Sequence, residues 1–357
     1  MLIGEMIGTY GLGEVDAGVV AAAEMAALAI TSMICARMLT LVPFRRIIFG
    51  GILCLAVGNM ASIYANSHLA LISVRVFCGI GAGSLLMVAS AAIAGFEDSD
   101  RAYGQINTTS ILAGMAGFAL APIVSSHFGT PITFPVILTI VIVLLPFAFL
   151  MPKNLAISSK SATAATSGNG DMPIDITLIS IGVVLSCSVL ASVWAFYVVL
   201  GERAGFGPDQ INVILTYAIL FTLLGSIFAS TIGHKFGRLA PSVGGLVIMT
   251  GAIVGLSLSH DPVVYRILTG LNLFGLYLFI PYFLGYASAA DPSGRGPAIV
   301  AGAFMLAAAL GPYLGGIAIG LIGIESLALI AIVANSISLA LFCVIDKRQK
   351  VPRTGTG

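Results

Sequence analysis

Two ionisable side chains stand inside long apolar segments, and they are the residues best suited to chemistry in this sequence. Glu24 lies in AAAEMAAL and Arg75 lies in SVRVFCG. An ionisable group in hydrocarbon is costly unless it is paired or faces water, so both side chains should point into the protein. We predict that Glu24 and Arg75 lie at similar depth and form a proton-coupling pair. The alternative is a static ion pair that fixes helix packing.

The composition identifies the environment in which these residues act. Hydrophobic residues make up 58% of the 357-residue chain and charged residues 9%, whereas an ordinary soluble domain has about 25% charged residues. A helix of about twenty apolar residues spans a bilayer with its backbone polar groups satisfied internally. The sequence therefore predicts an all-α integral membrane protein with eleven complete spans: 15–38, 47–65, 70–95, 105–127, 131–151, 176–200, 210–233, 240–259, 263–288, 297–320 and 326–345.

The two halves of the chain form an internal repeat. Landmark residues of the first half recur in the same order, at an almost constant separation, in the second half. The pairs are Gly11 with Gly205, Gly13 with Gly207, Arg45 with Arg238, Arg75 with Arg266, Gly79 with Gly270, and Pro122 with Pro312. The repeat predicts an N-terminal bundle over 1–152, a cytoplasmic linker over 153–175, a C-terminal six-helix bundle over 176–346 and a tail over 347–357.

The repeat also bears on the first helix. Residues 2–6 correspond to 196–200, which form the outer end of the predicted span 176–200. We therefore expect the sequence to begin inside its own first transmembrane helix, so that the N-terminal bundle has a truncated first helix. The alternative is an eleven-span protein with a short outer tail.

The basic residues predict the orientation. Of the 16 Lys and Arg residues, Arg75 and Arg266 lie within predicted spans and Arg203 lies on one side of the membrane. All the others lie on the side of the 153–175 linker. Because cytoplasmic loops are enriched in Lys and Arg, this asymmetry predicts a cytoplasmic C-terminus and a place in the cytoplasmic (inner) membrane.

Several motifs resemble those of the major facilitator superfamily. The family's RxxQG motif corresponds to Arg75, Cys78 and Gly79, with Cys78 in place of Gln. The family's GPxxGG motif stands intact at 311–316, within the predicted span 297–320. The resemblance covers the whole chain and implies two pseudo-symmetric six-helix bundles, alternating access and a monomer.

The family's loop motif is altered in both halves. Thr40 and His234 stand where the family has an acidic residue, so the motif positions supply no carboxylate for a gate ion pair. The glycines, prolines and basic residue of these motifs are still expected to govern helix packing and gating. They are Gly79, Gly83, Pro122, Gly237, Arg238, Gly311, Pro312, Gly315 and Gly316.

Aromatic and amide side chains are the candidate lining of a solute cavity. The resemblance implies that the spans 176–200, 210–233 and 263–288 face this cavity, and flat rings with polar tips suit a small aromatic or amphipathic solute. An interfacial aromatic belt is the alternative. For Arg266 a structural ion pair is the favoured interpretation. The candidate residues are Trp194, Tyr197, Tyr217, Asn272, Tyr277 and Tyr282.

Other chemistries lack their residues. The sequence has no GxxxxGK[ST] loop, no CxxC pair among its 5 cysteines and no histidine cluster, and its net charge is +1. We expect no enzyme activity, no cofactor, no metal and no nucleic acid partner. The leading hypothesis is a secondary transporter that exports a small organic solute with proton coupling inside the bilayer. The alternatives are proton-coupled uptake of an organic acid and a transport-inactive membrane sensor or scaffold.

Overall fold

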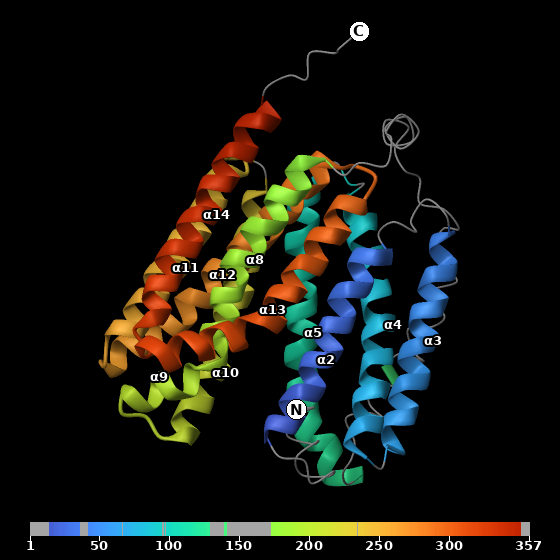
Figure 1. The fold of residues 1–357 in the computed structure, drawn as a ribbon, viewed down its shortest axis with the longest axis horizontal. Helices are drawn as coiled ribbons and strands as arrows, with labels where there is room; N and C mark the ends of the chain where they lie inside the picture. Colours follow the sequence, from blue (N-terminus) through green and yellow to red (C-terminus); the bar gives the residue numbers. More distant parts are fainter. Residues whose placement is uncertain are drawn as a thin grey trace. The chain divides into compact units, whose positions relative to one another are not determined.

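The protein is helical throughout the part of the chain that the computed structural model describes (Figure 1). That part comprises residues 14–35, 42–65, 67–94, 96, 98–128, 139–140, 173–233 and 235–350. The helices are α2 (Glu14–Cys35), α3 (Phe44–Ile63), α4 (His68–Ala94), α5 (Ser99–Phe128), α8 (Ile174–Ala195), α9 (Tyr197–Arg203), α10 (Pro208–Ile232), α11 (Leu239–Leu258), α12 (Pro262–Ala290), α13 (Arg295–Ile322) and α14 (Ser326–Lys350).

The predicted spans agree with these helices. Each span coincides with one helix except 176–200, which forms two helices, and 131–151, which lies almost wholly outside the described residues. Among the described residues, 8 helices are long and apolar enough to cross a membrane. The prediction of an all-α, multi-pass membrane fold is confirmed. The predictions for residues 1–13 and for most of the linker lie outside the described residues and stay predictions.

One predicted span is divided. The segment 176–200 forms α8 and the short α9, because Phe196 leaves the helical conformation with φ −107° and ψ 12°. A break exposes backbone groups that the helix would otherwise pair. The hydroxyl of Tyr265 on α12 donates to the carbonyl of Tyr197 at 2.9 Å and joins the start of α9 to α12. The sequence contains no proline at this point, so no residue type there predicts the break.

The chain divides into two compact units, and each unit takes helix segments from both halves of the sequence. The described residues of unit 1 fall within Met1–Ala92, Leu112–Gly168 and Ser293–Leu306. Those of unit 2 fall within Ile93–Ile111, Asn169–Pro292 and Ala307–Gly357. The start of α5 therefore belongs to unit 2, and the start of α13 belongs to unit 1.

Unit 1 is built on close helix contacts at glycines. A Cβ at Gly81 of α4 would lie 2.7 Å from the carbonyl oxygen of Gly51 on α3, so these two backbones touch. α2 packs against the start of α13, where the Ser32 hydroxyl donates to the Ala298 carbonyl at 3.0 Å. Small residues permit such close approach, which is how helices associate in a bilayer without a hydrophobic driving force.

Unit 2 has an aromatic core between α12 and α14. α12 packs against α10 and α11, and α8 packs against α14. The rings of Phe279 and Phe342 meet edge to face with centroids 5.2 Å apart, and Phe283 and Tyr286 extend the same cluster. This rigid core fixes the positions of the polar side chains that α12 carries at both of its ends.

Candidate functional site

Glu24 and Arg75 meet inside unit 1, as predicted from their shared isolation in apolar sequence. The Arg75 Nη1 atom lies 3.6 Å from the Glu24 Oε1 atom, and the side chains are 2% and 16% exposed. α2 supplies the carboxylate and α4 supplies the guanidinium. A charge that is this deeply buried requires a partner, so removing one member leaves the other uncompensated.

Four further residues support this pair. Asn59 on α3 accepts a hydrogen bond from Arg75 Nη2 at 3.2 Å, and the Cys78 thiol contacts the same nitrogen. Gly79 and Gly83 face α2 so closely that a Cβ on either glycine would overlap a backbone carbonyl of α2, that of Glu24 or that of Leu28. The two glycines thus bring the Arg75 helix into range of the Glu24 carboxylate.

A pocket of about 520 Å³ opens on unit 2 between α10 and α12. Phe206 and Phe221 form aromatic walls, and Tyr217, which is 64% exposed, contributes its ring and hydroxyl. Arg266 of α12 supplies the pocket's positive charge, and its guanidinium lies over the Phe206 ring at 4.9 Å from the centroid. The pocket combines flat apolar surface with a cation, which suits an amphipathic ligand.

Arg266 does not form the ion pair that the sequence favoured. No carboxylate among the described residues lies within ion-pair distance of its guanidinium. The sequence interpretation of this residue was therefore wrong. The repeat pairs Arg266 with Arg75, and this correspondence suggested the same role for both. Their surroundings differ, because Arg75 faces Glu24 and Arg266 faces an open pocket.

The other predicted lining residues do not gather at this pocket. Tyr197 and Asn272 are buried and bonded to each other, with the Asn272 amide donating to the Tyr197 hydroxyl at 2.8 Å. The Tyr282 hydroxyl donates to the Ala229 carbonyl at 3.3 Å. Trp194 is 52% exposed and meets the Tyr197 ring edge to face, and Tyr277 is half-buried. Substrate contact by these residues stays a prediction.

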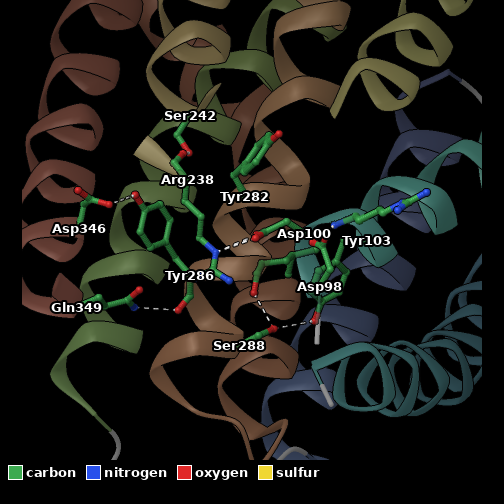
Figure 2. Close-up of polar contacts among 12 residues, drawn as sticks. Asp98, Asp100, Tyr103, Arg238, Ser242, Tyr282, Tyr286, Ser288, Asp346 and Gln349 are labelled. Carbon is green, nitrogen blue, oxygen red and sulfur yellow. Dashed lines mark hydrogen bonds and ion pairs between the residues drawn. The ribbon is translucent and has the colours of Figure 1, made fainter. Parts of the chain in front are cut away.

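A polar cluster occupies the end of unit 2 that the sequence predicts to be cytoplasmic (Figure 2). The Arg238 Nε atom donates to both oxygens of Asp100, at 3.0 and 2.9 Å. Asp100 is 1% exposed and lies in the first turn of α5, where the helix dipole favours negative charge. The carboxylate missing from the loop motif is thus supplied by another helix, which spacing within the motif could not reveal.

The same cluster extends to the last helix. Figure 2 shows the Arg238 side chain beside Tyr286, with its guanidinium carbon 6.0 Å from the ring centroid. The Tyr286 hydroxyl donates to Asp346 on α14 at 2.9 Å, and Gln349 donates to the Tyr286 carbonyl at 3.0 Å. Arg238 is therefore held by groups from α5, α12 and, through Tyr286, α14.

The glycine before Arg238 is required by the backbone. Gly237 has φ +71°, in the left-handed region that side chains other than glycine rarely adopt. The next residue, Arg238, is the N-cap of α11. The loop glycine thus lets the chain turn into α11 with Arg238 directed at Asp100.

The GPxxGG segment lies in α13 against α8. A Cβ at Gly315 would lie 2.6 Å from the Cβ of Ser192. A Cβ at Gly311 would overlap the backbone carbonyl oxygen of Ser188 on α8. The Ser192 hydroxyl donates to the Gly311 carbonyl at 2.6 Å, next to Pro312 inside the helix. Gly316 is less confined, with its nearest neighbour, Phe196, at 3.7 Å.

Two predicted positions cannot be placed in the same way. Pro122 falls within α5, but its side chain lies outside the described part, and His234 is also outside it.

An ion pair joins the end of α9 to the loop between α13 and α14 at the opposite end of unit 2. The Arg203 Nη2 atom lies 2.7 Å from the Glu325 Oε1 atom and 3.0 Å from the His260 Nε2 atom. A hydrogen bond from the backbone of Glu325, followed by the Arg203 guanidinium, lowers the pKa of the Glu325 carboxyl.

The comparisons with known proteins agree with the helical membrane fold described above. The family model of the Major Facilitator Superfamily matches residues 1–170. No curated protein matches the sequence.

Among solved structures, the chain is similar to the human organic anion transporter MFSD10 (TETRAN), with a TM-score of 0.74 and 15% identity over 96% of this chain and 88% of that chain. It is similar to the proton:xylose symporter XylE, with a TM-score of 0.77 and 12% identity over 96% of this chain and 90% of that chain. The transporter FucP in the outward conformation gives a TM-score of 0.76 and 11% identity over 98% of this chain and 94% of that chain. At these identities the likeness establishes a shared fold.

Proposed function

We propose that the chain is a member of the major facilitator superfamily, whose family model matches residues 1–170, and that it is a proton-coupled secondary transporter of a small organic solute. Transport proceeds by alternating access, in which two helical bundles open in turn to either side of the bilayer. The direction supported by the GPxxGG segment of α13 is export. The protein lies in the cytoplasmic membrane with its C-terminus inside.

The observation that carries the proton coupling is the Glu24–Arg75 pair. The pair is nearly withdrawn from solvent, and it connects α2 to α4. Protonation of Glu24 removes the negative partner of Arg75 and leaves a guanidinium whose neutral acceptor is Asn59 on α3. A proton can therefore change how strongly α2 is held to α4. Such a change is the kind of differential interaction that a conformational switch requires.

The experiment measures solute-driven proton flux in proteoliposomes with a pH-sensitive dye inside. Aromatic carboxylates and aromatic amines are applied in turn as solutes. Glu24→Gln should insert normally and lose proton flux, because Gln has nearly the same shape and does not ionise in this range. The matched control is Glu202→Gln, which removes an exposed carboxylate from α9. Full proton flux in Glu24→Gln would reduce the pair to a packing role.

A second candidate is proton-coupled uptake of an organic acid, which the Arg266 pocket favours. Arg75 is already paired with Glu24, whereas Arg266 faces open space. The same vesicles separate the two directions. In proton-coupled uptake, the acid accumulates on the side of the membrane to which the imposed gradient drives protons. In export by exchange, the solute accumulates on the side from which the protons leave.

A further inference from the structure

We propose that the pocket beside Arg266 binds the charged group of an amphipathic organic anion, and that an aromatic carboxylate is the class of compound that fits it. This inference deepens the proposed transport function and rests on it for its biological meaning. The pocket lies wholly within unit 2, between α10 and α12.

The first argument is the charge of the pocket. The residues that line it are Phe206, Gln210, Val213, Ile214, Tyr217, Ala218, Phe221 and Arg266. Among the residues whose side chains the structure describes, the lining contains one cation and no acid. An organic cation would meet an uncompensated like charge there, whereas an anion would meet an opposite one. The pocket therefore selects for negative charge.

The second argument is the state of the guanidinium. The guanidinium carbon of Arg266 lies over the Phe206 ring, 4.9 Å from its centroid, and none of the described hydrogen bonds uses the Arg266 N–H groups. A guanidinium carries five N–H donors in a fixed fork, and a contact with a ring leaves donors able to bind two carboxylate oxygens. Phe206 thus holds the cation in position without consuming its donors.

The third argument is the pair of neutral donors on α10. The Gln210 side-chain oxygen accepts the Gly207 backbone N–H at 3.2 Å, which leaves the amide nitrogen as the free end of the group. Tyr217 lies seven positions further along α10, two helical turns away on the same face, and its hydroxyl can donate. Together with Arg266, these groups give three donors around one pocket.

The fourth argument is the apolar part of the pocket. Phe206 and Phe221 supply ring surface, and Val213 and Ile214 supply aliphatic surface. The volume of about 520 Å³ falls in the usual range for small-molecule sites, roughly 300–1,000 Å³. A single or fused aromatic ring can lie against these walls while its carboxylate reaches Arg266.

The test is equilibrium binding of 1-naphthoate to the purified full chain in neutral detergent, measured by calorimetry. The neutral isostere 1-naphthamide reports the apolar contribution alone. Naphthoate should bind more tightly than naphthamide, and Arg266→Gln should weaken naphthoate binding by about 10-fold, or about 1.4 kcal/mol. Arg266→Lys keeps the charge and should restore part of the loss. Arg46→Gln removes an exposed arginine from α3 and should change nothing.

A second variant guards against misfolding. Tyr217→Phe removes one hydroxyl from a side chain that is 64% exposed, so it should not disturb packing. It should weaken naphthoate binding by a few fold and leave naphthamide binding unchanged. Equal affinity of the wild-type protein for both probes, or naphthoate binding that is insensitive to Arg266→Gln and Tyr217→Phe, would overturn the proposal.

Two further arms identify the source of the anion and separate this inference from proton coupling. Naphthoate binding is repeated in nanodiscs of neutral phosphatidylcholine with and without anionic phosphatidylglycerol. If the anionic lipid weakens naphthoate binding to the wild-type protein but not to Arg266→Gln, the site binds anions and its occupant is a lipid headgroup. If the lipid does not compete with naphthoate, the site binds soluble anions. Binding is also measured in Glu24→Gln. Retained binding with lost proton flux supports both proposals, whereas retained binding with retained flux refutes only the coupling.

Discussion

Gly285 on α12 offers a sharp test of the Arg238–Asp100 ion pair, because a single methyl group there would disrupt the pair without removing either charge. A Cβ at Gly285 would overlap the Asp100 carboxylate and lie 3.0 Å from the Arg238 Nε atom. Gly285→Ala therefore pushes the carboxylate away from its partner. Breaking a buried ion pair costs about 3–5 kcal/mol, and alanine in a helix interior returns about 1 kcal/mol. We expect a net loss of about 2–4 kcal/mol in the free energy of unfolding.

The measurement is the loss of helical circular dichroism as sodium dodecyl sulfate is added to the detergent-solubilised protein. Gly251→Ala on α11 is the control, because no atom lies within 4 Å of its added Cβ. The decisive comparison is Gly285→Ala in the Asp100→Ala background. With the carboxylate gone, the methyl meets only the flexible Arg238 side chain, which can move aside, so the substitution should be neutral or mildly stabilising. If the two changes add to within about 0.5 kcal/mol, the reasoning from this geometry is refuted.

Three further predictions concern other parts of the chain. Gly79→Ala should destabilise the protein by about 1–3 kcal/mol in the same titration, because its methyl overlaps the α2 backbone. Gly50→Ala, with no atom within 4 Å, should not; equal effects would contradict the packing argument. The pKa of Glu325 is lowered in the folded protein, so its stabilisation is present above its ordinary value of 4.5 and is lost as the pH falls through the lowered pKa. Below pH 4.5 the thermal midpoint of Glu325→Gln should vary less with pH than that of the wild-type protein, and parallel curves would refute the assignment. In a background without native cysteines, His260→Cys should react with an impermeant thiol reagent from outside and Lys350→Cys only after permeabilisation; the reverse pattern would invert the topology.

The sequence predicted the features that depend on local composition. Span positions follow from the length of apolar runs, because any such run must satisfy its backbone within itself in a bilayer. The meeting of Glu24 and Arg75 also follows from sequence reasoning, since each charge is costly to bury alone and no other charge lies near it in the chain. Gly79 was recognised by its motif, and its contact with α2 explains why a small residue stands there.

The tertiary structure alone decided the features that join distant segments. Asp100 and Arg238 are separated by 138 positions. The sequence of the loop motif therefore does not show the carboxylate that pairs with Arg238, which comes from the start of α5 within unit 2. Tyr197 and Tyr217 looked equivalent as aromatic cavity residues, yet one is buried against Asn272 and the other is exposed at a pocket. Local sequence determines whether a helix forms and whether it crosses the membrane. Which face of that helix meets a partner, a pocket or lipid depends on rotations and close approaches set by every neighbouring helix at once.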